Sequence, residues 1–411
     1  MNAPSEFDPI FVHASMRSGS TYFFNVLRRN EALLCFNEAI SGGKGRFKEI
    51  PQGRLEAQKQ TMNHHFLDRD DFAELVEARD AVMHLCLEFP EFHDYLPPKG
   101  VLPSGLFTYL SALMKHARSK GKRPVLCEIY SRGRAGALRG AFGGFHIAQY
   151  RNPLSQFGSF IHLVIERGWW AFLAFPLREL GISGMHPLYR LVPEAWRVPV
   201  LPWPTNNSGQ RWATEVHYMA TVASPRLETI ENVFRWHLFS WVLSNLAAVS
   251  YSDLTLDIDT LHDDADYRAS VIRNVAGEIG VTPDFSDIRK FDRYYEFESF
   301  DVAVVCNQVI STIRSALADG RLDAALRTLG TQPPITPAAA AVERLLEKIR
   351  DSLAAMTSPT ERHYIGVNEW KGIAEKNQRI WFNSNARWLA QHLYPVAAPA
   401  VRAARRAGIP I

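Results

Sequence analysis

Short apolar runs alternate with amphipathic runs along the first part of the chain. The first apolar run is Ile10–His13, and a polar turn and an amphipathic run to Arg29 follow it. Short apolar runs bounded by turn residues are typical of buried strands, and apolar residues at helical spacing are typical of helices. The pattern therefore predicts a strand, a tight loop and a helix over residues 10–29.

The same alternation continues further along the chain. Apolar runs predict more strands, and amphipathic runs predict helices between and after them. Strands that alternate with helices imply a parallel sheet that is covered by helices on both faces. The predicted fold class is therefore α/β, with three layers. The predicted strands are 33–36, 124–129 and 145–150, and the predicted helices are 70–87, 106–118, 229–249, 300–317 and 338–353.

A long segment rich in aromatic residues and proline, residues 166–232, interrupts this rhythm. Long loops in compact domains are usually functional or disordered, and the tryptophans argue against disorder. Two interpretations stay open: the wall of an acceptor site, or the core of a subdomain or dimer contact. We expect one domain over 1–411, with a core at 8–165 and 233–300, this insertion, and a C-terminal helical part at 300–411. The tryptophans of the insertion are Trp169, Trp170, Trp196, Trp203 and Trp212.

Charge and cysteine content narrow the function classes. The 46 basic and 43 acidic residues leave a formal charge of +3. This small charge gives no strong positive electrostatic field that would attract nucleic acid, so any anion site must be local. The four cysteines form no CxxC pair, which argues against a disulfide framework and a zinc site. No apolar run predicts a transmembrane segment or a signal peptide, so we expect a cytoplasmic protein. The basic tail at 402–406 is expected to be a solvated end, with peripheral contact to an anionic membrane as the alternative.

The turn after the first predicted strand reads Arg17-Ser18-Gly19-Ser20-Thr21. Between a strand and a helix, such a turn directs backbone N–H groups and the positive end of the helix dipole at one point, where a phosphate is stabilised. The loop lacks the GxxxxGK[ST] pattern of Mg²⁺-dependent triphosphatases, because no lysine follows Gly19. The alternative is a helix that is capped by Ser18 or Ser20 and has no ligand.

A second candidate phosphate motif follows the predicted strand at 145–150. Arg151 comes at the end of this strand, Pro153 suits the first turn of a helix, and Ser159 lies about two turns along it. An arginine binds phosphate oxygens bidentately, and a serine hydroxyl donates one more hydrogen bond. The pair therefore suits a terminal phosphate monoester.

Glu38 is a candidate proton acceptor, because it follows the predicted strand at 33–36. Ligands of open α/β sheets bind outside the carboxyl ends of the strands, which places Glu38 beside Arg17 if the two strands are neighbours. A carboxylate in this place accepts a proton from an attacking hydroxyl. The alternatives are a solvated acid or an ion pair with Arg17.

These motifs resemble those of sulfotransferases that use 3′-phosphoadenosine-5′-phosphosulfate and have a P-loop NTPase-like α/β fold. The turn at 17–21 resembles the 5′-phosphosulfate loop of the family, and Arg151, Pro153 and Ser159 match its 3′-phosphate motif. The segment 254–279 resembles its late strand, acidic turn and helix. The resemblance implies that this donor is the co-substrate and that no metal is required. The donor-binding residues that it implies are Arg17, Ser18, Gly19, Ser20, Thr21, Tyr22, Arg151 and Ser159.

The resemblance also implies catalytic roles. Glu38 lies twenty-one residues after Arg17. In tyrosylprotein and several bacterial sulfotransferases, a glutamate at about this spacing from the loop arginine is the general base, so the resemblance assigns that role to Glu38. Arg17 would stabilise the charge on the leaving phosphate. The implied reaction is in-line transfer of a sulfuryl group to a hydroxyl of a glycan, a lipid-linked sugar or a phenol.

The sequence departs from this family in three places. Arg17 stands where better-known cytosolic members have lysine, and Arg132 or Arg134 replaces the catalytic lysine that many relatives carry after the corresponding strand. A glycine-rich cofactor loop near the C-terminus is missing, and we expect a turn at 363–372 instead. Two other functions stay open: a metal-dependent, kinase-like P-loop enzyme, and a nucleotide-binding protein of the same fold without catalysis.

Overall fold

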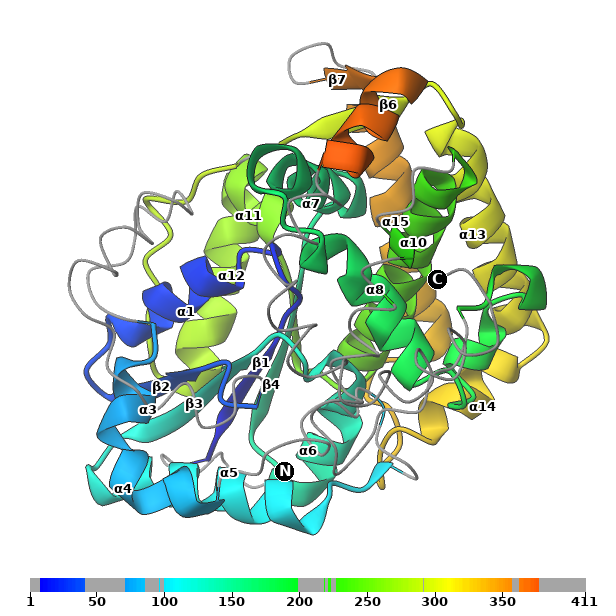
Figure 1. The fold of residues 1–411 in the computed structure, drawn as a ribbon. Coiled ribbons are helices and arrows are strands. Elements are labelled where there is room, and N and C mark those ends of the chain that lie inside the picture. Colours follow the sequence, from blue (N-terminus) through cyan, green and yellow to red (C-terminus); the bar gives the residue numbers. More distant parts are fainter. Residues whose placement is uncertain are drawn as a thin grey trace, which may run out of the picture.

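The computed structural model shows a sheet in one half of the molecule and a group of helices beside it (Figure 1). Trp203, Trp212 and the tail at 402–406 lie outside the residues that the structure describes. The described residues are 8–40, 71–85, 96, 100–198, 218, 221–222, 227–290, 292–356 and 362–376.

A five-stranded parallel sheet forms the centre of the α/β half. Its strand order is β2-β3-β1-β4-β5, so β1 lies in the middle and its carboxyl end is flanked by those of β3 and β4. The predicted parallel sheet is confirmed, and each predicted strand forms at its expected place. The strands are β1 (Ile10–His13), β2 (Leu33–Asn37), β3 (Arg123–Glu128), β4 (Phe145–Tyr150) and β5 (Leu254–Asp257).

Helices cover both faces of the sheet, because successive side chains of a strand point to opposite faces. Val12 belongs to one hydrophobic cluster with Phe23 and Val275, whereas Phe11 belongs to a different cluster with Leu113 on the opposite face. The three predicted layers are therefore confirmed. The first face carries α1 (Ser20–Arg28), α11 (Ile258–Asp263) and α12 (Ala265–Ile279). The second carries α3 (Ala73–Glu77), α4 (Arg79–Val82), the 3₁₀ turn η2 (Met83–Leu85), α5 (Ser104–Ser119) and α6 (Ala135–Phe142).

A second hydrophobic core lies among the helices beside the sheet. The helix α10 (Leu227–Ser250) runs through it and is apolar over most of its circumference, with Val233 and Leu238 fully buried. A helix that is apolar on all sides is an interior helix. Ala148 and Tyr150 of β4 belong to the same core, so the sheet and the helices pack continuously. The other helices of this part are α7 (Pro153–Arg167), α8 (Ala171–Ile182), α13 (Val302–Ala318), α14 (Arg321–Arg327) and α15 (Ala338–Ala355).

The described part of the aromatic insertion belongs to this second core. Trp170 and Tyr189 are buried there, and α8 packs along α10. The ring of Trp196 is partly buried, and the guanidinium of Arg235 lies over it at 4.8 Å from the ring centroid. These described aromatic side chains thus pack within the protein. Two short 3₁₀ turns, η5 (Tyr189–Leu191) and η6 (Glu194–Trp196), complete the described insertion.

A small second sheet was not predicted from the sequence. It pairs β6 (Tyr294–Phe297) with β7 (Arg362–Ile365) in parallel, and residues 367–376 then form a helix. The prediction of a turn at 363–372 is therefore wrong. Three of the four β7 residues are exposed, so the strand has no apolar run by which the sequence could reveal it.

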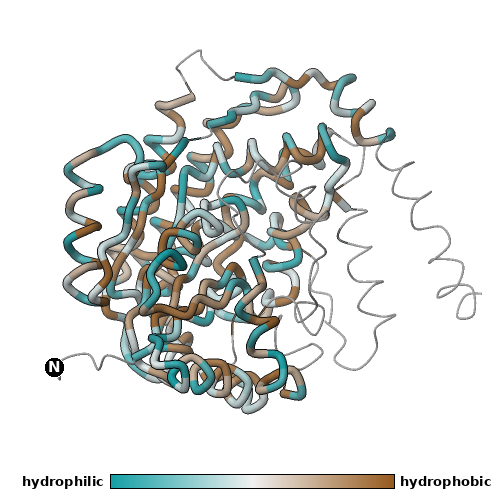
Figure 2. The backbone as a smooth tube through the Cα atoms, turned by 90° about the vertical axis from the view of Figure 1, so that its left-hand side faces the viewer, coloured by the Kyte–Doolittle hydropathy of each residue, from teal (hydrophilic) through white to brown (hydrophobic). Residues whose placement is uncertain are grey.

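Hydrophilic and hydrophobic positions alternate along most helices (Figure 2). In the part of the chain that the structure describes, no helix has the length and apolar character to span a membrane.

Candidate functional site

The loop between β1 and α1 has two residues in the left-handed conformation. Arg17 has φ of 61° and Gly19 has φ of 82°, and α1 begins directly afterwards at Ser20. Backbone N–H groups near such left-handed residues form concave anion-binding nests. Glycine adopts this conformation without strain, whereas the same conformation destabilises an arginine by roughly 1–2 kcal/mol. The loop therefore has the backbone shape of an anion site.

The hydroxyl group of Ser18 holds the loop together. Its Oγ donates to the carbonyl oxygen of Ser15 at 2.7 Å, and Gln149 Nε2 donates to the carbonyl oxygen of Ser18 at 2.9 Å. The residue that caps α1 is Gly19, and it offers no side-chain hydrogen bond. The alternative of a helix capped by Ser18 or Ser20 is thus wrong. The first N–H groups of α1 have no intrahelical acceptor, as at any helix start.

The side chain of Arg17 reaches the second motif. Its Nε donates to Oγ of Ser159 at 3.0 Å, across 142 residues of sequence. Burial and the positive charges of Arg151 and Arg293 lower the pKa of Arg17 to about 10. Within the described ranges, no carboxylate lies at ion-pair distance from Arg17. The alternative of an ion pair between Arg17 and Glu38, both of which the structure describes, is therefore wrong. A largely buried guanidinium beside two others is a strong attractor for an anion.

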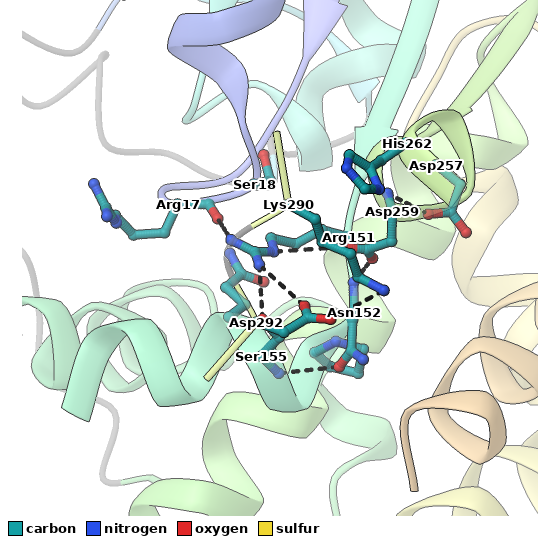
Figure 3. A network of polar contacts seen from close by, with 12 residues as sticks. Arg17, Ser18, Arg151, Asn152, Ser155, Asp257, Asp259, His262, Lys290 and Asp292 are labelled. Carbon is teal, nitrogen blue, oxygen red and sulfur yellow. Dashed lines mark hydrogen bonds and ion pairs between the residues drawn. The ribbon is translucent and has the colours of Figure 1, made fainter. Parts of the chain in front are cut away.

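Arg151 connects the first motif to the second from the other side (Figure 3). Its Nη1 donates to the carbonyl oxygen of Arg17 at 3.1 Å, and its Nη2 donates to Oγ of Ser155 at 2.7 Å. Carboxylate oxygens of Asp259 and Asp292 lie 3.9 Å and 3.8 Å from the guanidinium. The structure therefore joins the two predicted motifs at one edge of the sheet.

The remaining loop residues divide into two groups. Gly19, Ser20 and Thr21 are half-buried at the start of α1. The phenol of Tyr22 instead donates to Oδ1 of Asp287 at 3.0 Å, and burial together with Asp287 raises its pKa. The hydroxyl of Tyr22 thus already forms a hydrogen bond within the protein.

Glu38 lies at the same edge of the sheet but is not next to β1. The strand order places β3 between β1 and β2, so the condition for Glu38 to lie directly beside Arg17, that the first two strands are neighbours, is not met. The N–H of Glu38 donates to the carbonyl oxygen of Cys127 at 2.7 Å, which fixes its backbone to the end of β3. The carboxylate of Glu128 accepts the N–H of Ile40 at 3.1 and 3.2 Å and closes the turn.

Backbone strain marks the two residues to which the sequence assigned catalytic roles. Glu38 has φ of 48°, and it and Arg17 are the two non-glycine residues with positive φ in the described chain. Strained backbone of this kind persists only where surrounding contacts enforce it, and it clusters at functional sites. The strain therefore singles out both residues independently of any sequence motif.

Both candidate substitutes for the family lysine are buried. Arg132 lies in the buried 3₁₀ turn η4 (Arg132–Arg134), and its Nη2 donates to the carboxylate of Glu179 on α8 at 3.2 Å. Glu179 is itself buried and accepts the hydroxyl of Ser244 at 2.6 Å. Arg134 is completely buried. The structure therefore gives Arg132 a role in holding α8.

Sequence reasoning missed several charged residues around Arg151. Asp257 caps α11, and Asp259 accepts the N–H of Asn152 at 2.5 Å. Lys348 of α15 pairs with both carboxylates. A lysine within the apolar stripe of a predicted helix was the signal that could have identified it.

A second missed group lies above α7. Arg293 precedes β6 and contacts Nδ1 of His162, which lies one turn beyond Ser159 on the same face of α7. Burial and the charges of Arg293 and His363 lower the pKa of His162. Arg293 is thus a third guanidinium close to Arg17.

Comparison of this chain with protein-family models, with curated proteins and with solved structures finds no match.

Proposed function

We propose that the protein transfers a sulfuryl group from 3′-phosphoadenosine-5′-phosphosulfate to an acceptor hydroxyl, and that its sheet has the P-loop NTPase-like sulfotransferase fold. The observation that carries this proposal is the meeting of two phosphate motifs that are far apart in sequence. Arg17 contacts Ser159, and Arg151 contacts the backbone of Arg17. The contacts lie outside the carboxyl end of the central strand, where the chain has strands on both sides and ligands of α/β sheets bind.

The residues divide between the two anionic groups of the donor. The N–H groups at 19–21 and the guanidinium of Arg17 serve the 5′-phosphosulfate, because the loop nest and the start of α1 face the same point. Arg151 and Ser159 serve the 3′-phosphate, to which Arg293 adds a further positive charge. Three arginines match a donor that carries several negative charges.

The chemical step uses Glu38 as base. The acceptor oxygen forms a bond to sulfur while the bond between sulfur and the 5′-phosphate oxygen breaks, and the acceptor proton passes to the Glu38 carboxylate. Negative charge develops on the leaving phosphate, where Arg17 and the loop N–H groups stabilise it. The acceptor class is a glycan, a lipid-linked sugar or a phenol.

Calorimetric titration with 3′-phosphoadenosine-5′-phosphate in the absence of metal tests the donor site. The full chain should bind this nucleotide, and Arg151→Ala should weaken binding at least tenfold, because one charge-assisted phosphate contact contributes about 1.5–3 kcal/mol. Arg314→Ala is the control, since Arg314 forms an exposed ion pair with Glu343 on the helical part. Binding of ATP with Mg²⁺ alone would identify a kinase-like enzyme instead, and binding of neither nucleotide would refute the proposal.

Transfer itself is measured with radiolabelled donor and a set of phenols and sugars. Label appearing on an acceptor, and lost in Glu38→Gln, supports catalysis. Donor binding without any transfer would favour the nucleotide-binding protein without activity.

A further inference from the structure

One charged side chain of α15 reaches into the candidate donor site. Lys348 is 9% exposed, although Leu345 and Ile349 beside it on α15 are part of the hydrophobic core. Its Nζ lies 2.8 Å from the carboxylate of Asp257 and 3.0 Å from Oδ2 of Asp259. A buried lysine is costly unless its charge is paired, so these two carboxylates determine its position.

One of the two carboxylates, Asp259, also lies near Arg151, the arginine that we assign to the 3′-phosphate (Figure 3). Oδ2 of Asp259 accepts the N–H of Asn152 at 2.5 Å, and Oδ1 lies 3.9 Å from Nε of Arg151. Asn152 in turn caps α7, which carries Ser159. The start of α7, α11 and α15, which are distant in sequence, are thus joined by one carboxylate.

Lys348 controls how strongly Asp259 attracts Arg151. Among the residues described, these are the two cations within 4 Å of Asp259, and Lys348 is the nearer, at 3.0 Å against 3.9 Å. Attraction between charges grows as their distance falls. If Lys348 lost its charge, Arg151 would become the nearest cation and would move onto Asp259, away from a bound phosphate.

We propose that Lys348 is a positioning residue of the donor site. By neutralising Asp257 and Asp259, it leaves the guanidinium of Arg151 directed at the 3′-phosphate. The C-terminal helical part therefore contributes to nucleotide recognition through Lys348 of α15. This inference rests on the proposed donor and concerns its 3′-phosphate specifically.

The experiment compares the affinities of the full chain for 3′-phosphoadenosine-5′-phosphate and for adenosine 5′-phosphate, which lacks the 3′-phosphate. Lys348→Met should lose at least tenfold in affinity for the bisphosphate and less than twofold for the monophosphate. Ser352→Ala is the matched control, because the Ser352 hydroxyl donates to the carbonyl oxygen of Lys348 at 2.5 Å on the same helix. This control removes a buried contact of α15 without changing the charge of the helix. The ratio of its affinities for the bisphosphate and the monophosphate should equal that of the wild type.

A compensating variant separates positioning from folding. Lys348→Met combined with Asp259→Asn removes the lysine together with the one of its two carboxylate charges that lies within 4 Å of Arg151, so the preference for the bisphosphate should return. An unchanged affinity ratio in Lys348→Met, or no recovery in the double variant, would overturn the positioning role. Failure of the proposed function is a different result: the wild type would then show no preference for the bisphosphate, or Arg151→Ala would leave that preference intact, and the inference would fall with it.

Discussion

Substitution of Arg17 by glycine should stabilise the protein while it removes donor binding. The left-handed backbone of Arg17, with φ of 61°, costs roughly 1–2 kcal/mol that glycine does not pay. Burial and two neighbouring arginines lower the pKa of Arg17 to about 10. That shift corresponds to about 3 kcal/mol of destabilisation of the charged form. The penalty is fully present at neutral pH, and it decreases as the pH rises above the folded-state pKa of about 10, because the folded protein then loses the proton before the unfolded chain does.

The glycine variant also loses favourable terms. The greater entropy of the unfolded chain costs roughly 0.5–1 kcal/mol, and the lost hydrogen bond to Ser159 costs about 1 kcal/mol. The relief of strain, burial and charge repulsion, about 4–5 kcal/mol, exceeds these costs of about 1.5–2 kcal/mol, so we expect the free energy of unfolding to rise by about 2–3.5 kcal/mol.

Denaturant unfolding in buffer without phosphate or sulfate measures this gain. Glu38→Gly isolates the strain term, because Glu38 also has positive φ but carries no positive charge, so its gain should be smaller. The bisphosphate nucleotide at a hundred times its Kd should stabilise the wild type by about 2.7 kcal/mol and should leave Arg17→Gly nearly unchanged. A less stable Arg17→Gly variant, or equal stabilisation of both proteins by the nucleotide, would refute the reasoning.

Three further substitutions test other parts of the structure. Gly158→Ala should lower the free energy of unfolding by about 1–3 kcal/mol in thermal denaturation, because a Cβ there would lie 2.0 Å from a backbone oxygen of the segment before β6; wild-type stability would contradict this packing. Glu179→Leu should lower the free energy of unfolding by about 3–5 kcal/mol, because it leaves Arg132 charged and buried. Glu343→Gln, at an exposed ion pair, should lower it by less than about 1 kcal/mol. Similar losses in the two variants would argue against the buried pair. Glu38→Gln should reduce kcat of sulfuryl transfer by about 10²–10⁴-fold with donor Kd unchanged, and an unaltered kcat would exclude Glu38 as the base.

The sheet was predictable because its strands are buried apolar runs bounded by turn residues. Parallel strands end at a common edge, so a meeting between Arg17 and Arg151 also followed from the pattern. The order of the strands did not follow, because pairing between strands that are distant in sequence leaves no local signal. For this reason the sequence could place Glu38 beside Arg17 only on the condition that the first two strands are neighbours, and β3 in fact lies between them.

The partners of buried charges were the second limit of the sequence. Arg132 follows a strand end, as a site residue should, yet its partner Glu179 comes from an insertion whose helix the aromatic composition concealed. Lys348 lies 197 residues after Arg151, and only the packing of α15 brings its charge to Asp259. Periodicity identifies a buried helix face, but it does not identify what that face contacts.

The distribution of carboxylates explains how one site can hold two arginines with different tasks. Asp259 and Asp292 lie near Arg151 and balance its positive charge. Lys348 weakens the attraction between Asp259 and Arg151, because it pairs with Asp259 itself. Within the described residues Arg17 has no such carboxylate, and its carbonyl oxygen is tied to Arg151. Arg151, whose charge is balanced by nearby carboxylates, therefore holds the loop in place. Arg17, which has no such carboxylate among the described residues, retains its attraction for an anion. Because that attraction is electrostatic, donor affinity should fall as ionic strength rises, and inorganic sulfate should compete for the loop at Arg17.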